Sequence, residues 1–290
     1  MYSGEFFFPC PIISEPKKAL LKEIEVGDYL SLLKFIKNDN AADIIFFINY
    51  ILEKYLIIQK NNPPIHILDK FAILLSLRST ILGPDVYILT TDNKRIKISI
   101  NDILSNLLNH KFTETETILK HGVMIHLGYP SDFYGEDVDF FENIIQSVHY
   151  ADFEPMSFSK LDKQEKSAIL DKLNFCIQDI KKYIQTLNDN LRECVLFRTP
   201  AADITISLTD DSILHLLKIL LAEDLKSIYN IAFILISKAN FTWSDIKTLN
   251  PAEMHIFYNQ LIAENKELED KMKRPQSSIG AVVDSMKGSA

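Results

Sequence analysis

Glycine is scarce in this chain: only 8 of the 290 residues are glycine, and each stands alone. A phosphate-binding loop needs several closely spaced glycines, so neither a P-loop nor a dinucleotide-binding fingerprint can form. The motifs Gly-x-Ser-x-Gly and His-Glu-x-x-His are also absent. These absences weaken an enzymatic function, although a catalytic triad assembled across a fold leaves no local spacing.

Cysteine is also rare, and the three cysteines are odd in number and far apart: Cys10, Cys176 and Cys194. They build neither a disulfide framework nor a metal knuckle, which favours a reducing cytosol. The chain begins without a basic segment, and prolines soon interrupt its apolar start, unlike a signal peptide. The most apolar stretch, residues 42–58, contains charged residues and is shorter than the roughly 20 residues that cross a bilayer. We expect a soluble intracellular protein with no membrane contact.

A basic excess is missing as well, because 31 basic residues stand against 39 acidic ones, for a net charge of −8. This balance argues against nucleic-acid binding and leaves proteins as the expected partners. Hydrophobic residues make up 47% of the chain, which excludes wholesale disorder. The length is typical of one or two domains.

Hydrophobic periodicity predicts an α+β fold that is predominantly helical, with small antiparallel β-hairpins and two helical segments flanking a β-rich middle. We divide the chain into an N-terminal α+β domain (1–150), a mainly helical C-terminal domain (151–273) and a flexible tail (274–290). The predicted helices are 26–36, 42–59, 68–82, 102–108, 136–149, 160–173, 175–191, 211–222, 225–239 and 251–273. The predicted strands are 5–13, 18–26, 86–89, 95–100, 114–119, 123–127, 194–197 and 204–208.

Some predictions concern single positions in these helices. The helix 42–59 is apolar nearly all round, which predicts a central position in the fold. Asn101 is placed to cap the short helix after it. Asn250, followed by Pro251 and Glu253, forms a capping-box pattern at the start of the last helix.

An acidic stretch before residue 143 is the strongest candidate for a metal site, because carboxylates suit magnesium or calcium. Its spacing matches no calcium loop, and acidic residues are also favoured at a helix N-terminus. We therefore predict helix capping and a solvated surface, with no metal or other cofactor. A divalent-metal-dependent enzyme remains the weakest alternative. The residues are Asp132, Glu136, Asp137, Asp139 and Glu142.

Arg78 lies near the end of an apolar helix, nine residues after Asp69 and beyond the reach of an i,i+4 pair. A guanidinium in such a place needs an acceptor, because an unpaired buried charge is very costly. We favour a structural ion pair or anchor for Asp69 and Arg78, with the arginine over the Gly83-Pro84 turn. A partner-facing arginine is the alternative.

The last helix provides the best candidate for partner binding. Its apolar stripe is wide through Ile262, where we expect it to pack on its own domain, and then narrows. The narrow end and the small apolar residues of the tail can be captured by another chain. The alternative is a surface helix with a disordered tail. The candidate partner-binding residues are Leu268, Met272, Ile279, Val282 and Val283.

The order of several segments resembles the baseplate hub assembly protein family of T-even-like, contractile-tailed bacteriophages. The resemblance extends over about residues 5 to 272 and consists of weak motifs in a fixed order. The segments are Phe8-Pro9-Cys10-Pro11, Lys18 to Val26, Leu68-Asp69-Lys70-Phe71, Leu77 to Gly83, Ile125 to Pro130, Leu225 to Asn230, Trp243 to Leu249 and Asn250-Pro251-Ala252-Glu253.

The resemblance implies a non-enzymatic role in building the hub of the tail baseplate, as a component or an assembly factor. It implies partners among other tail, hub or tape-measure proteins, and no small-molecule substrate. It places the protein in the host cytoplasm during assembly and, for a component, in the virion tail. A transient chaperone or adaptor absent from the mature particle is the alternative. The family carries over no catalytic residue, and Asp69 and Arg78 match recurring positions that are taken as structural.

Overall fold

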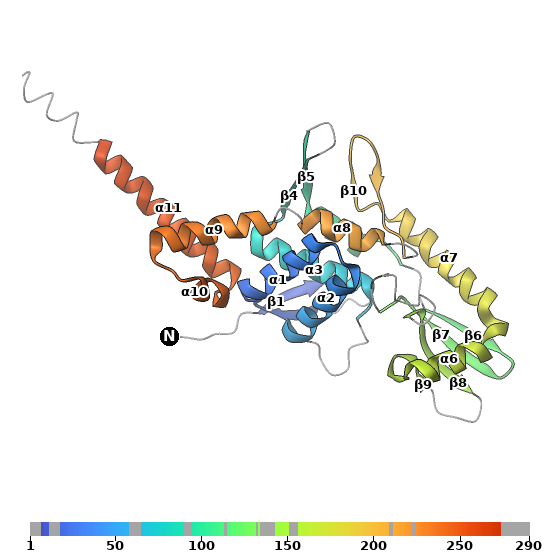
Figure 1. Cartoon of the computed structure of the whole chain (residues 1–290). Coiled ribbons are helices and arrows are strands. Elements are labelled where there is room, and N and C mark those ends of the chain that lie inside the picture. The colour runs from blue at the N-terminus through green and yellow to red at the C-terminus, as the bar shows by residue number, and fades with distance from the viewer. Residues whose placement is uncertain are drawn as a thin grey trace, which may run out of the picture. The chain divides into compact units, whose positions relative to one another are not determined.

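The computed structural model (Figure 1) describes most of the chain, in two compact units. The first unit comprises Met1–Glu23 and Ser31–Asp224, and the second comprises Ile24–Leu30 and Leu225–Ala290. The predicted domain boundary near residue 150 falls inside the first unit and stays a prediction. The described residues are 7–11, 18–57, 65–89, 94–112, 115–131, 133, 143–150, 156–208, 211–221 and 224–273.

The structure confirms the predicted class, an α+β fold that is predominantly helical with small antiparallel sheets. Near the N-terminus, three short strands form an antiparallel sheet in the order β1-β2-β3. Three helices follow or separate these strands. The strands are β1 (Phe7–Pro11), β2 (Lys18–Lys22) and β3 (Leu56–Ile57), and the helices are α1 (Val26–Asn38), α2 (Ala41–Tyr55) and α3 (Ile67–Leu82).

The helix buried on most of its circumference is α3, which corrects the prediction that the segment 42–59 is central. Contacts with β1, α4 (Ile100–Asn109) and α8 (Ser212–Leu221) cover α3 on several sides. Helix α2 instead buries one face and leaves Phe46 71% exposed. Both helices are strongly apolar, so the difference comes from the neighbours that the fold provides and not from composition.

The predicted hairpin is confirmed as β4 (Asp85–Leu89) and β5 (Arg95–Ser99), with Val86 opposite Ile98. Helix α4 (Ile100–Asn109) follows directly. Its N-cap is Ser99, whose hydroxyl accepts a hydrogen bond from the N–H of Asp102 at 3.2 Å, so the prediction of Asn101 as the cap is wrong. The strand runs into the helix without a connecting loop, and its last residue therefore supplies the cap.

A four-stranded antiparallel sheet has the order β6-β7-β8-β9. Its strands are β6 (Glu116–Lys120), β7 (Val123–Leu127), β8 (Ile145–Tyr150) and β9 (Met156–Ser157). The helix predicted over 136–149 is wrong at its end, because β8 begins at Ile145; residues 136–142 lie outside the described residues. Ile145 and Val148 have helical spacing, but pairing with buried β7 sets Val148 opposite Ile125.

The rest of the first unit is mainly helical. The short strands β10 and β11 pair through only two residues each, fewer than the predicted 194–197 and 204–208. Beyond β11, the backbone N–H groups have side-chain acceptors in place of a second strand. The Ser207 N–H donates to the Ser212 hydroxyl at 2.8 Å, and the Leu208 N–H donates to Oδ1 of buried Asn188 at 2.8 Å. The elements are the 3₁₀ turns Phe158–Lys160 and Asn174–Cys176, helices α6 (Lys163–Lys172), α7 (Ile177–Glu193) and α8 (Ser212–Leu221), and strands β10 (Phe197–Arg198) and β11 (Asp203–Ile204).

The second unit contains α9 (Asp224–Ala239), α10 (Trp243–Thr248) and α11 (Pro251–Lys273). The predicted capping box of α11 is confirmed: the Glu253 N–H donates to Asn250 Oδ1 at 2.8 Å, and the Asn250 N–H donates to Glu253 Oε2 at 3.1 Å. Helix α10 was missed by the sequence prediction, although Thr242 and Asp245 form a second capping box. The core of this unit includes Val26, Ile228, Leu235, Ile246 and Met254.

Candidate functional site

Asp69 and Arg78 lie at opposite ends of α3. Asp69 is fully buried in the first turn, where its Oδ2 accepts a hydrogen bond from the His66 N–H at 3.2 Å. Arg78 is 5% exposed and donates from Nη1 to the carbonyl oxygen of Gly83. Each residue therefore contacts the backbone at one helix end, and the role of the two as a structural ion pair or anchor stays a prediction.

His66 is the N-cap of α3, which the sequence prediction missed because histidine is an uncommon cap. Its Nδ1 accepts hydrogen bonds from the N–H groups of Leu68 at 3.2 Å and Asp69 at 3.4 Å. Burial lowers the pKa of His66, and the neighbouring Asp69 carboxylate opposes this shift. The cap thus requires a neutral imidazole, which is a structural use of the side chain.

Helix α9 has two apolar stripes that lie next to each other on its surface. Ile228, Ala232 and Leu235 are buried in the core of the second unit. The residue after each of them is also apolar: Tyr229, Phe233 and Ile236. These three residues form a second stripe with the spacing i, i+4 and i+7, which we call the α9 stripe. These side chains are exposed, with Phe233 at 71%. One face of α9 is thus apolar and partly exposed, most of all at Phe233.

The α9 stripe is held in place at its first residue. The Tyr229 ring stacks on Trp243 of α10, with centroids 5.7 Å apart and an interplanar angle of 8°. Lys247 lies over the other ring of this pair, 5.9 Å from the Trp243 centroid. The stacking orders the tyrosine before any partner binds, which reduces the entropy lost on binding. A sequence signal was present: every residue from 228 to 236 except Asn230 is apolar, which is more than one buried face of a helix needs.

Helix α11 presents a second exposed apolar surface. Met254 is buried, but Ile262 is 44% exposed, so the prediction that the stripe packs on its own domain through Ile262 is wrong. Leu268, a predicted partner-binding residue, is 52% exposed. Met272 lies in the last turn of α11. The remaining predicted partner-binding residues, Ile279, Val282 and Val283, lie outside the described residues.

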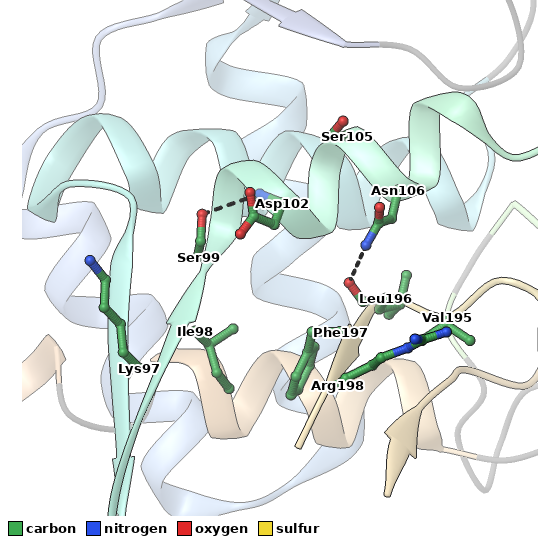
Figure 2. A pocket seen from close by; sticks show the side chains of 10 residues that line it. All are labelled: Lys97, Ile98, Ser99, Asp102, Ser105, Asn106, Val195, Leu196, Phe197 and Arg198. Carbon is green, nitrogen blue, oxygen red and sulfur yellow. Dashed lines mark hydrogen bonds between the residues drawn. The ribbon is translucent and has the colours of Figure 1, made fainter. Parts of the chain in front are cut away.

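A third surface lies in the first unit, between the β4–β5 hairpin and the segment that ends in β10 (Figure 1). It is an open pocket of about 560 Å³, which we call the hairpin slot. Figure 2 shows that β5, α4 and residues 195–198 line it. Asn106 of α4 connects the two walls, because its side-chain amide donates to the carbonyl oxygen of Leu196 at 2.9 Å.

The floor of the hairpin slot is apolar and its rim is charged. Ile98 and Leu196 are buried, and Phe197 is half-buried beside them. Lys97 and Arg198 are exposed on opposite walls, and each pairs with a carboxylate of its own hairpin: Lys97 Nζ lies 2.7 Å from Asp85, and Arg198 Nε lies 3.4 Å from Asp203. The hydrogen bond to Asp85 raises the pKa of Lys97, so this residue is a cation at neutral pH.

The acidic stretch and the cysteines are the sequence candidates for metal or nucleophilic chemistry. Among the residues that the structure describes, no three histidine, cysteine or carboxylate side chains gather in a way that could hold a metal ion. The acidic candidates Asp132 to Glu142 lie outside the described residues. Burial raises the pKa of Cys194 to about 11 and also raises that of Cys176, so neither thiol is an activated nucleophile. Across the described part of the chain, the helices are too short or too polar to span a membrane.

A comparison with protein families matches residues 10–193 to the model described as T4 bacteriophage base plate protein. The match covers more than half of the chain and ends before α8. Neither the curated proteins nor the solved structures contain a significant match.

Proposed function

This chain belongs to the family of the T4 bacteriophage base plate protein, and on that premise we propose that it works in the central hub of the tail baseplate. In this proposal it acts through protein–protein contacts and without catalysis, as a hub component or as an assembly factor. Its partners are other tail, hub or tape-measure proteins. It acts in the host cytoplasm during assembly, and a hub component then stays in the virion tail.

The α9 stripe is the observation that carries this proposal. Exposed aromatic and aliphatic side chains in a row are costly to leave in water, at about 25 cal/mol per Å² of apolar surface. Tyr229 and Phe233 are of the residue types that supply contact area in the centre of interfaces. A helix face of this kind suits a helical partner whose apolar residues have the same i, i+4, i+7 spacing.

The chain offers a matched pair of residues for testing this assignment. Phe233 and Phe46 are both 71% exposed and lie on helices, but in different units. We expect Phe233→Ser to reduce the recovery of co-expressed baseplate proteins with the tagged full-length chain by at least about tenfold, while Phe46→Ser leaves it unchanged. Equal recovery with both variants, or equal loss with both, would contradict binding through the α9 stripe.

The C-terminal segment is the second proposed contact. Leu268 and Met272 on α11, and Ile279, Val282 and Val283 beyond it, form an apolar series at the end of an acidic helix. Removing residues 274–290 is expected to weaken hub subassembly in the same pull-down. Unchanged subassembly would remove the tail from the proposed interface and leave the α9 stripe as the contact.

A hub component and a transient assembly factor differ in their place after assembly. Quantitative mass spectrometry of purified particles separates them. A fixed copy number per particle indicates a component, whereas absence from particles that require the chain for assembly indicates an assembly factor.

A further inference from the structure

The hairpin slot is bounded by two strand edges that are open on the side facing the slot. Within the described ranges, β5 pairs with β4 alone and β10 pairs with β11 alone. Both strands line the slot, and the strands β4 and β11 behind them do not. An uncovered strand edge presents N–H and C=O groups that can pair with another chain.

The pairing pattern shows which backbone groups face outward. The N–H of Ile100 donates to the carbonyl oxygen of Pro84 at 2.8 Å, so this position is hydrogen-bonded across the hairpin. Hydrogen-bonded and non-hydrogen-bonded positions alternate in antiparallel pairs. With Lys97 opposite Tyr87, Lys97 falls on a non-hydrogen-bonded position and directs its N–H and C=O away from β4.

The other wall has the same arrangement. The N–H of Thr199 donates to the carbonyl oxygen of Ala202 at 2.9 Å, which makes that pair hydrogen-bonded. Arg198, opposite Asp203, is therefore in the non-hydrogen-bonded position and directs its backbone groups away from β11. Each wall thus combines an outward-facing backbone position with a cationic side chain.

We propose that the hairpin slot takes up an extended segment of a partner protein as an added β-strand, with apolar residues toward the floor and acidic residues beside Lys97 and Arg198. Side chains of a strand alternate between two faces, so such a segment alternates apolar and acidic residues. Its apolar side chains meet Ile98 of β5 and half-buried Phe197 of β10, both of which line the slot in Figure 2. Backbone hydrogen bonds supply affinity, and the alternation supplies specificity.

The charges that line the slot favour an acidic segment, because the cations Lys97 and Arg198 outnumber the carboxylate of Asp102. The two cations of the rim form exposed ion pairs with carboxylates of their own hairpins, and exposed pairs of this kind contribute little stability. A carboxylate that enters between them gains a cross-strand pair with each. A lysine on an edge strand also deters pairing with an edge that is positively charged or uncharged. This favours an acidic partner strand and argues against pairing between the β5 edges of two copies of this chain.

The inference goes beyond the proposed function, because it concerns a different unit and a partner recognised through its backbone. The test uses the purified full-length chain and a short fluorescent peptide in which valine and glutamate alternate, with a valine–lysine peptide as the control. We expect the glutamate peptide to bind at least about tenfold tighter in fluorescence anisotropy. Equal binding of both peptides, or no binding, overturns the proposal. Hub proteins take no part, so the result is independent of the hub assignment.

Three variants locate the binding. Lys97→Pro removes the outward N–H, the charge and the ion pair with Asp85. It removes no backbone hydrogen bond to β4, because Lys97 is in a non-hydrogen-bonded position, where proline is tolerated. It is expected to lower affinity about tenfold or more. Lys97→Glu keeps the N–H and is expected to shift the preference toward the lysine peptide, which keeps the proposal testable if the proline variant misfolds. Lys172→Glu, an exposed residue of α6, makes the same charge change elsewhere and should bind normally.

Unchanged preference in Lys97→Glu contradicts recognition at this edge. Sedimentation of the chain alone provides a further check on the occupant. A dimer that Lys97→Pro dissociates would mean that a second copy fills the slot, and this would overturn the assignment to a partner protein.

Discussion

Helices α3 and α9 have the same length, 16 residues, and both are strongly apolar, yet the fold treats them differently. In α3, eleven residues are buried, including Asp69 and Arg78. In α9, Ile228, Ala232 and Leu235 are buried, and the α9 stripe next to them is exposed. The apolar surface of α3 is covered by β1, α4 and α8 of the same chain.

The difference shows that apolar content alone does not separate a core helix from a binding helix. What separates them is the number of neighbours that cover each face. A helix that is apolar on more faces than its own unit covers has surface left for another protein. By this measure α3 stabilises the first unit. Helix α9 stabilises the second unit through its buried stripe and leaves the α9 stripe exposed, where we propose that a partner binds.

The largest expected effect is in α3. Phe71 is fully buried, so the chain packs against its ring on every side. Replacing it by alanine removes this ring, and we expect a loss of about 3–5 kcal/mol in the free energy of unfolding. Guanidinium denaturation followed by circular dichroism measures this. Phe46→Ala on the exposed face of α2 is the control. A loss no larger than that of the control would mean that α3 is not the central helix.

The buried stripe of α9 is expected to behave like α3. Leu235 is fully buried, and Leu235→Ala should cost about 2–5 kcal/mol through lost transfer energy and the cavity that remains. The same denaturation experiment applies, with tryptophan fluorescence as the probe because Trp243 lies in the second unit. A cost below about 0.5 kcal/mol would place Leu235 on a surface and break the division of α9 into two stripes.

The cap of α3 makes an intermediate, pH-dependent contribution. Burial lowers the pKa of His66 below its ordinary value of 6.5. The unfolded chain therefore binds this proton more readily, so the stabilisation is complete above pH 6.5 and is lost as the pH falls through the lowered pKa. His66→Asn keeps a good N-cap that does not titrate.

We expect the melting temperature of the native chain to fall more between pH 7.5 and pH 5 than that of His66→Asn. The difference should correspond to a cap contribution of about 1 kcal/mol. Parallel pH curves for the two proteins would contradict a neutral imidazole cap.

The smallest effect on stability is expected in the α9 stripe. Phe233→Ser removes an exposed ring, and the free energy of unfolding should change by no more than about 0.5 kcal/mol. The same variant is expected to lose partner binding. Together with Leu235→Ala, two residues away, it separates the stabilising stripe from the binding stripe. A loss of several kcal/mol would show that the ring is covered by its own chain.

Local features of the sequence predicted much of the fold. The β4–β5 hairpin follows from alternation over residues 95–100, and the start of α11 follows from Asn250 and Glu253, because these signals lie within a few residues of each other. The family resemblance also extended over the region that the family model matches. These features depend on short-range geometry, which a sequence displays directly.

Features that depend on distant partners were predicted poorly. The segment from Ile145 has helical spacing but forms β8, because β7 offers an edge to pair with. The pairing of β10 and β11 ends before residue 207, where the N–H groups of Ser207 and Leu208 donate to the side chains of Ser212 and Asn188. Ser99 replaces Asn101 as a cap, because the strand continues directly into α4. In the first two cases a contact from elsewhere in the chain overrode the local preference, whereas the cap depends on where β5 ends.

The same division applies to the candidate surfaces. The amino-acid sequence by itself determined that the chain is acidic, poor in glycine and without the catalytic motifs considered above. It also determined that α9 and α11 carry apolar residues in series, since composition and spacing do not depend on which residues are neighbours in space. Only the tertiary structure decided which apolar stripe is covered, and that Lys97 and Arg198, 101 residues apart in the chain, line one slot. Burial and strand edges are properties of neighbours in space, and long-range packing alone assigns those neighbours.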